Sequence, residues 1–312
     1  MRLVKRQLKN RPWCHCFLYF LQSPTTSNSN LIHTVMRSNT QKWNKMKKLS
    51  LLLLSISFFV IGCNKEIDLN LPEYEPKLVL EFYLENNTSL RCLLQESTMY
   101  TDTSQLRLVN DATVIVSYNG IRQTLVNRMI IDPRFDKIYN YYNPHIIQLQ
   151  PNTEYEVYVK DGKGRELRGK TKLNNLVPID SLVYNFNASN KAAAGLLFKD
   201  DSRTKNYYRI VAFKDAPVVK QDSLWDITFN DNLFNGEQFS FYTGYAYNRG
   251  DTITSRLYHL TEEHYRFTES VNNAQASNGN PFGQPANIIS NLTGGLGIFT
   301  TLIYDEKKVI VR

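Results

Sequence analysis

The segment that begins at Leu78 alternates apolar side chains with other side chains at a period of two, which is the period of a β-strand. Apolar positions of an amphipathic helix would instead recur every three or four residues. The apolar face of this strand would hold Leu78, Leu80, Phe82 and Leu84, and the opposite face Lys77, Val79, Glu81 and Tyr83. The sequence therefore predicts β-structure from this point onward.

Turn signals divide the following hundred or so residues into short strands. Asn119-Gly120 stands between two β-prone runs, and both residues tolerate the positive φ of a type I′ hairpin turn. The segment 149–155 ends in Tyr155 and resembles the tyrosine corner of fibronectin-type sandwiches, in which the tyrosine hydroxyl binds backbone groups a few residues upstream. We therefore expect an immunoglobulin-like β-sandwich over residues 77–175.

Residues 176–312 are expected to form a second β-rich domain with one inserted helix. The helix should open at Thr261, because Glu262 and Glu263 would then place their carboxylates at the positive end of its dipole. It should end before Asn278, which starts a turn-like run. Strands are expected at 181–186, 207–213, 223–229, 237–242, 251–260 and 297–304.

Residues 46–62 have the pattern of an export signal. Two lysines follow Met46, and the fourteen residues 49–62 contain nothing more polar than serine, which is fewer than the roughly 20 apolar residues that span a bilayer. The run Val60-Ile61-Gly62-Cys63 is similar to a bacterial lipobox, in which a small residue precedes the cysteine that receives lipid. We expect cleavage before Cys63 and lipid attachment to it. The alternative is a membrane anchor or a buried helix that ends at a free cysteine.

Residues 1–45 do not fit ahead of this signal, because such a signal normally has only a short basic segment before its apolar part. We interpret them as a misannotated upstream extension, with Met46 or Met36 as the start. Residues 1–62 hold ten Lys and Arg and no Asp or Glu, so their removal lowers the net charge from +8 to −2. The basic character that would favour a nucleic-acid partner is thereby lost, and we expect none.

Residues 63–76 are expected to form the lipid anchor and a tether, since they are polar and contain two prolines. The charged start of the tether is similar to the signal that sends lipoproteins of Bacteroidota to the cell exterior, but an ordinary solvated linker explains it equally well. Of the four cysteines only Cys63 and Cys92 would remain, so no internal disulfide is expected. Cys92 lies in an apolar run and should be a small buried hydrophobe.

The sequence contains no recognisable catalytic constellation, and we expect neither enzymatic activity, nor a metal, nor a cofactor. His259 and His264 are five residues apart, so they diverge on a helix and on a strand and cannot form a local metal pair. Asp231 and Gly236 match a calcium loop in part, but Leu233 occupies a ligand position. A hydrolase site assembled from His259, His264 and Asp231 stays a third-ranked hypothesis.

Two further patterns permit two readings each. The glycines at 294, 295 and 297 could cradle a phosphate, but they more readily permit a tight turn or close backbone packing before a strand. Tyrosine clusters are expected either in the core or at a ligand-binding surface. The candidate surface residues are Tyr139, Tyr141, Tyr142, Tyr245 and Tyr247.

Four segments, 76–81, 176–181, 231–236 and 280–299, together resemble a lipoprotein family of Bacteroidota known as domain of unknown function 4249. The resemblance covers nearly all of the mature chain. The last segment is the most specific, because its order of Pro, Asn, Gly and aromatic residues is unlikely to recur by chance. Phe82-Tyr83 departs from the family pattern, which has glycine and tryptophan there.

This resemblance implies an outer-membrane lipoprotein, often encoded beside a TonB-dependent receptor, without established catalytic activity. We therefore expect a lipid-anchored protein of the outer membrane, facing the cell exterior, that acts as a binding or accessory component of a TonB-dependent nutrient-uptake system. Its partners would be the membrane, through lipid on Cys63, the receptor and an unknown ligand. The alternative is an adhesive or structural surface module.

Overall fold

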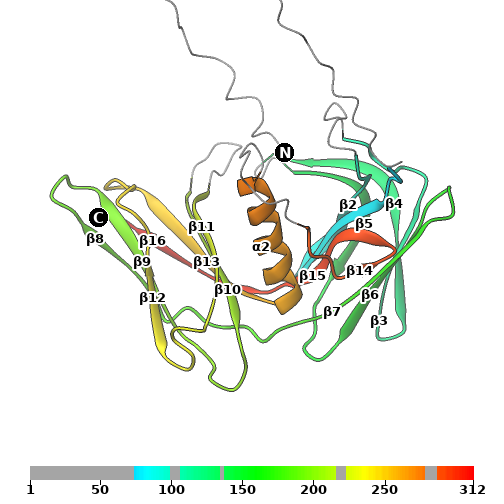
Figure 1. The fold of residues 1–312 in the computed structure, drawn as a ribbon. Coiled ribbons are helices and arrows are strands. Elements are labelled where there is room, and N and C mark those ends of the chain that lie inside the picture. The colour runs from blue at the N-terminus through cyan, green and yellow to red at the C-terminus, as the bar shows by residue number, and fades with distance from the viewer. Residues whose placement is uncertain (1–73, 99–105, 134–136, 216–222, 278–286) are drawn as a thin grey trace, which may run out of the picture. The chain divides into compact units, whose positions relative to one another are not determined.

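The described part of the protein consists mainly of β-strands, as predicted, with one inserted α-helix (Figure 1). The computed structural model describes residues 74–98, 106–133, 137–215, 223–277 and 287–312. The expected upstream extension, the signal peptide, Cys63 and the tether before residue 74 lie outside these ranges. The elements are β1 (Leu78–Glu85), β2 (Thr88–Glu96), β3 (Thr113–Tyr118), β4 (Ile121–Asp132), β5 (Lys137–Ile147), β6 (Glu154–Lys160), β7 (Glu166–Lys172), β8 (Ser181–Phe186), β9 (Ala192–Lys199), β10 (Tyr207–Lys214), β11 (Ser223–Asn230), β12 (Gln238–Tyr242), β13 (Thr252–Leu260), α2 (Glu262–Ser277), β14 (Leu292–Thr293), β15 (Gly295–Leu302) and β16 (Tyr304–Ile310).

Nine strands form one sheet in the order β14-β7-β6-β3-β4-β5-β2-β1-β15. β14 and β15 stand at opposite ends of this order although only Gly294 separates them, so the sheet curls until its two ends meet. The long strand β4 pairs with β3 through its first half and with β5 through its second half, and it thereby joins the two layers. The apolar face of β1 is buried in the core between the layers, as its alternation predicts.

Two local predictions for this sandwich are confirmed. Asn119 and Gly120 have φ values of 45° and 75°, and they connect the antiparallel strands β3 and β4 as a tight hairpin. The Tyr155 side chain is fully buried, and its hydroxyl accepts a hydrogen bond of 2.8 Å from the backbone N–H of Gln150. This is the tyrosine corner, which ties the chain before β6 to the core.

The C-terminal part contains a four-stranded sheet, β11-β10-β13-β16, and a three-stranded sheet, β12-β9-β8. Apolar and aromatic side chains from both sheets form a second core. The rings of Phe198 on β9 and Tyr208 on β10 meet there edge to face, with centroids 4.8 Å apart. This arrangement leaves the other face of β10 available to line a different part of the molecule.

The strand expected at residues 297–304 forms, but it belongs to the nine-stranded sheet and not to a sheet of the C-terminal part. β15 pairs in parallel with β1, from Leu78 opposite Gly295 to Glu85 opposite Leu302. Gly297 has a φ of 111°, and a Cβ atom there would lie 2.0 Å from the carbonyl oxygen of Leu80. The glycines therefore serve close backbone packing, and a division at residue 176 does not separate the sheets.

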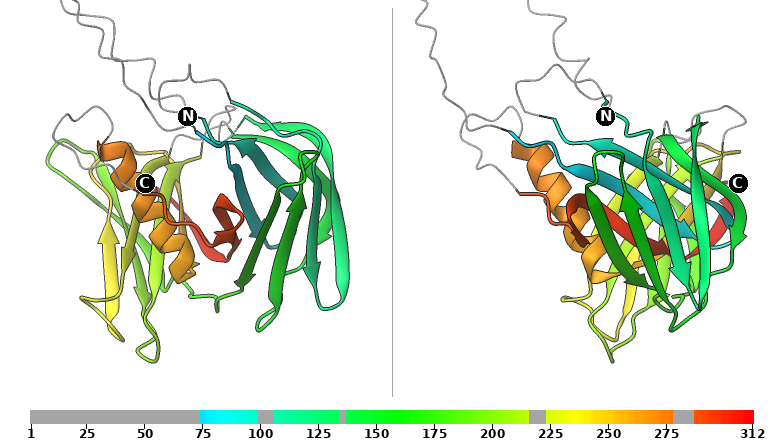
Figure 2. Two further views of the ribbon diagram at one scale, coloured as in Figure 1. Left: turned by 45° about the vertical axis from the view of Figure 1, so that its right-hand side comes forward. Right: turned by 90° about the vertical axis from the view of Figure 1, so that its right-hand side faces the viewer.

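The predicted helix is confirmed as α2. The Thr261 hydroxyl accepts a hydrogen bond of 3.3 Å from the backbone N–H of His264, and two glutamates occupy the first turn. The helix contacts β10, β11 and β15, and it lies between the four-stranded sheet and the sandwich (Figures 1 and 2). Within the described ranges, no helix combines the length and apolar character needed to cross a bilayer.

Four strands escaped sequence-based prediction, of which β14 has only two residues. β9 is rich in alanine, which does not favour strands, yet both of its faces are buried between neighbouring elements. β16 has four consecutive charged residues, Asp305 to Lys308, after its first residue, and it pairs with β13 at the edge of its sheet. β5 has an irregular pairing with β2, because the step from Ser89 to Leu90 on β2 faces the longer stretch from Ile146 back to Asn143 on β5, and this bulge interrupts the alternation that would reveal the strand.

Candidate functional site: a charged cavity between two sheets

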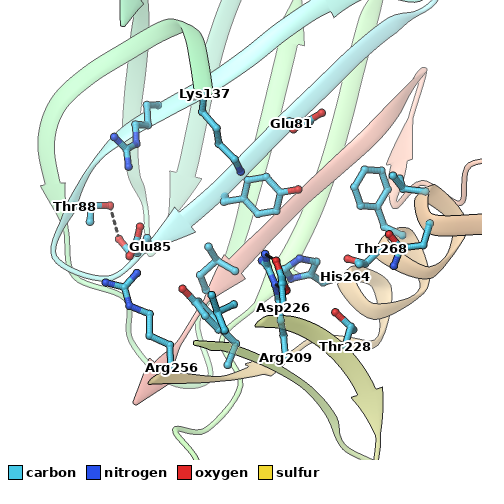
Figure 3. A pocket seen from close by; sticks show the side chains of 18 of the residues that line it. Glu81, Glu85, Thr88, Lys137, Arg209, Asp226, Thr228, Arg256, His264 and Thr268 are labelled. Atoms are coloured by element: carbon cyan, nitrogen blue, oxygen red, sulfur yellow. Dashed lines mark hydrogen bonds and ion pairs between the residues drawn. The ribbon is translucent and has the colours of Figure 1, made fainter. Parts of the chain in front are cut away.

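A cavity of about 550 Å³ lies between the nine-stranded sheet and the four-stranded sheet, with α2 along one side (Figure 3). One wall comes from β1, β2 and β5, and the facing wall from β10, β11 and β13. Sites for small molecules typically enclose about 300–1,000 Å³. The cavity is therefore large enough for a small organic ligand.

The first wall follows from the alternation of β1. Because successive side chains of a strand point to opposite faces, burial of Leu80 and Phe82 in the core turns Glu81, Tyr83 and Glu85 toward the cavity. β2 adds Thr88 and Arg91, and β5 adds Lys137 and Tyr139.

The second wall is set by the register of β10 with its two neighbours. Arg209 on β10 lies opposite Thr228 on β11 and opposite Tyr258 on β13. Residues paired in this way share one face of the sheet, so all three side chains line the cavity. Asp226 and Arg256 lie opposite Val211 in the same manner and extend this wall.

All three arginines that line the cavity have carboxylate partners. Arg209 binds Asp226 through two parallel hydrogen bonds, Nε to Oδ1 at 2.7 Å and Nη2 to Oδ2 at 2.6 Å. Burial alone would lower the pKa of Arg209, but the bonds to Asp226 raise it. Arg256 Nε lies 2.7 Å from Glu306 Oε2, and Arg91 lies 3.4 Å from Asp132. These arginines are therefore largely neutralised.

Glu81 and Lys137 line the same cavity without an ion pair or hydrogen bond to any residue that the structure describes. The Lys137 ammonium lies 5.2 Å from the centroid of the Tyr83 ring, which offers a cation–π contact. Burial lowers the pKa of Lys137; Glu81 opposes this effect, while Arg209 and Arg91 add to it. Figure 3 shows Glu81 and Lys137 on the same side of the cavity, with Arg209 and Asp226 facing them.

His264 is the most buried titratable group of the cavity wall. Its side chain is 2% exposed, and its Nδ1 has no hydrogen-bond partner among the described residues. Burial, together with the positive charges of Arg209 and Lys137, lowers the pKa of His264 to about 3. The imidazole is therefore neutral at physiological pH, and its ring lies 5.5 Å from that of Tyr83.

Tyrosine hydroxyls complete the polar lining. Burial raises the pKa values of Tyr83, Tyr139 and Tyr258 above the ordinary value of a phenol. All three stay protonated at neutral pH and can donate hydrogen bonds. The cavity thus combines neutral donors, aromatic rings and a few charges, which suits the binding of a polar small molecule.

The tyrosines proposed as a binding surface do not lie together. Tyr139 lines the cavity, Tyr142 is half-buried beneath Arg128, and Tyr245 is 48% exposed. Tyr141 and Tyr247 are fully buried in two different cores, so neither can belong to a surface. Tyr141 has a structural role, because its hydroxyl accepts a hydrogen bond of 2.8 Å from the backbone N–H of Ala112.

The three residues of the hydrolase hypothesis, His259, His264 and Asp231, do not form a common site. Only His264 lines the cavity. The His259 ring stacks on Tyr208, and its Nδ1 lies 2.8 Å from the carbonyl oxygen of Asn175. The Asp231 carboxylate accepts a hydrogen bond of 2.6 Å from the backbone N–H of Asn206. Within the described ranges, no cluster of three or more His, Cys, Asp or Glu side chains could hold a metal ion.

Several cavity residues were not identified from the sequence as site residues. The alternation of β1 places Glu81 and Tyr83 opposite the apolar face, and this signal could have pointed to them. No local pattern marks Lys137, Arg209 or Asp226, because their roles depend on strands that are distant in sequence. Cys92 is fully buried, as expected for a small hydrophobe.

Comparisons with known proteins complete this description. No curated protein matches the chain. Two solved structures described as a cytokine receptor complex are similar. Crystal form 1A has 8% identity and a TM-score of 0.25, covering 74% of this chain and 96% of that chain. Crystal form 2 has 9% identity and a TM-score of 0.24, covering 59% and 92%. Scores this low carry no argument.

The resemblance to a family is much more extensive. Residues 64–308 match the family described as a domain of unknown function, DUF4249. The match includes β1, both walls of the cavity and α2. The chain therefore belongs to the family of domain of unknown function 4249.

Proposed function

We propose that the protein is a ligand-binding lipoprotein of a Bacteroidota outer membrane, anchored through lipid on Cys63 and facing the cell exterior. It acts as an accessory component of a TonB-dependent nutrient-uptake system. The observation that carries the binding role is the cavity of about 550 Å³ whose lining holds two charged side chains, Glu81 and Lys137, without ionic partners among the described residues. Charges held in this way favour a polar ligand.

The anchoring part of the proposal is supported by the sequence around Cys63. The family match begins at residue 64, directly after this cysteine. Gly62 supplies the small side chain before the expected cleavage site, and residues 49–61 supply the apolar segment for export. Several acyl chains on one cysteine anchor a protein stably in a membrane, since each buried methylene contributes about 0.8 kcal/mol to the free energy of membrane binding.

The receptor part of the proposal is supported by the family resemblance and is tested in native membranes. We expect a tagged, lipidated protein purified in a mild detergent to carry a TonB-dependent β-barrel receptor with it. The matched control is Cys63→Ser, which should incorporate no labelled fatty acid and leave the membrane. Purification without a receptor, under conditions that preserve a known receptor complex, would contradict the accessory role.

A deletion strain distinguishes this role from that of an adhesive module. Loss of growth on one nutrient with normal attachment supports the uptake role. Normal growth on every nutrient together with lost attachment would replace it by adhesion. Fatty-acid label that persists in Cys63→Ser would show that the anchor is elsewhere.

A further inference from the structure

Charge pairing inside the cavity is incomplete, and this identifies the atoms that remain available to a ligand. Arg91, Arg209 and Arg256 each have a carboxylate partner at 3.4 Å or less. The Glu85 carboxylate interacts with the hydroxyl of Tyr304. Among the described residues that line the cavity, one acid and one base, Glu81 and Lys137, remain without an ion pair or hydrogen bond.

The two free charges are close to each other without touching. β2 lies between β1 and β5 in the sheet, so Glu81 and Lys137 belong to the same wall of the cavity, two strands apart. Glu81 raises the pKa of Lys137, so the two groups interact electrostatically although no ion pair forms. The ring of Tyr83 lies beside the Lys137 ammonium, at 5.2 Å from its centroid.

A ligand with a single charge cannot satisfy such a pair. A ligand carboxylate bound to Lys137 would displace water from the Glu81 side chain and leave Glu81 unpaired. A ligand amine bound to Glu81 would likewise leave Lys137 unpaired. Desolvating a charge without pairing it is costly, so one-sided binding is disfavoured. A molecule that carries both groups leaves neither Glu81 nor Lys137 desolvated and unpaired.

We propose that the cavity binds a small zwitterion, with its ammonium group on Glu81 and its carboxylate group on Lys137. This inference rests on the proposed binding function and names the ligand class for the same site. The Tyr83 ring lies beside the carbon chain that joins the two groups. The Arg209–Asp226 pair binds itself in a bidentate manner and forms the opposite wall.

A series of ω-amino acids tests the inference on the lipidated protein, purified from membranes in a nonionic detergent. The probes are glycine, 4-aminobutyrate and 6-aminohexanoate, which differ in the separation of their charges. Acetate and methylamine, butyrate and butylamine, and hexanoate and hexylamine are the single-charge controls. Isothermal titration calorimetry should show one member of the series binding at least about tenfold more tightly than both of its single-charge counterparts.

Two variants assign the charges. Glu81→Gln should weaken the best zwitterion by about ten- to a hundredfold, to the affinity of the matching carboxylic acid. Lys137→Met keeps the apolar stem of the side chain. This variant should bind the best zwitterion only as tightly as the matching amine. The matched controls are Glu237→Gln and Lys172→Met, which change exposed residues outside the cavity lining and should leave affinity unchanged.

Each result decides the inference. Equal affinity for a zwitterion and a single-charge control, unchanged zwitterion affinity in Glu81→Gln or Lys137→Met, or no binding across the series would overturn it. If a receptor still co-purifies in those cases, the accessory function stands and only the ligand class is wrong. If the zwitterion binds and no receptor co-purifies, the site stands and the accessory function fails.

Discussion

On one face of β1, Leu80, Phe82 and Leu84 are at most 1% exposed and pack in an apolar core. On the other face, Glu81, Tyr83 and Glu85 line a cavity to which the described residues contribute seven charged side chains. The first face contributes stability by removing apolar surface from water, and it has no group left unsatisfied. The second face keeps charged groups accessible to a ligand. This arrangement lowers the stability of the fold and allows the cavity to recognise a polar molecule. The same strand thus separates the part that folds the protein from the part proposed to bind a ligand.

The largest expected effect is on the apolar face. Phe82 is fully buried, and its ring meets that of Phe299 edge to face at 5.4 Å. Phe82→Ala should lower the free energy of unfolding by about 3–5 kcal/mol, because it leaves a cavity in a close-packed core. Tyr83→Phe, on the other face, should change it by less than about 0.5 kcal/mol. Urea denaturation of both variants checks this contrast, and similar losses in the two would remove the distinction between the faces.

The next effect concerns His264 in the cavity wall and depends on pH. Its pKa is about 3 in the folded protein, against an ordinary value of 6.5. Between these values the unfolded chain binds a proton that the folded protein does not, so stability falls as the pH falls through this window. At pH 4.5 this residue should lower the free energy of unfolding by about 2–3 kcal/mol relative to pH 7.

The His264→Gln variant isolates this contribution. We expect its free energy of unfolding to fall less steeply than that of the wild-type protein between pH 6.5 and 4.5. The comparison uses the slopes, because the substitution itself changes packing. Parallel pH profiles would show that the imidazole takes up a proton in the folded state and that this wall is open to water.

A smaller effect is expected for the ion pair of the second wall. Asp226 and Arg209 are 41% and 33% exposed at their side chains, so solvent screens their attraction. A double-mutant cycle with Arg209→Met and Asp226→Asn should give a coupling energy of about 0.5–1 kcal/mol. A coupling well above about 2 kcal/mol would mean that the cavity is drier than the exposure indicates.

The smallest effect is expected where the cavity face has free charges. Glu81→Gln and Lys137→Met should each change the free energy of unfolding by no more than about 0.5 kcal/mol, since neither residue has an ionic partner among the described residues. Thermal denaturation of the two variants and the wild-type protein measures this change in stability. A loss above about 1 kcal/mol in either variant would assign the residue a structural role and weaken the argument for recognition.

Much of the fold could be predicted from local patterns. The alternation of β1, the Asn119-Gly120 turn, the tyrosine corner at Tyr155 and the start of α2 at Thr261 each depend on residues within one short segment. Turn geometry, helix capping and strand burial act over a few residues, and one sequence is enough to reveal them. The export signal ending at Cys63 is likewise a local pattern, and it stays a prediction because it lies outside the described residues.

The site was decided by contacts between distant segments. Glu81 and Lys137 line the same wall because β2 pairs with both β1 and β5, and the facing wall depends on the register of β10 with β11 and β13. The alanine-rich β9 becomes a strand only because neighbouring elements cover both of its faces. β15 returns across the chain to pair with β1, where Gly297 permits a backbone contact that a side chain would block. Strand pairing over such separations depends on which surfaces are buried together in the whole fold, and that information is not contained in any short segment.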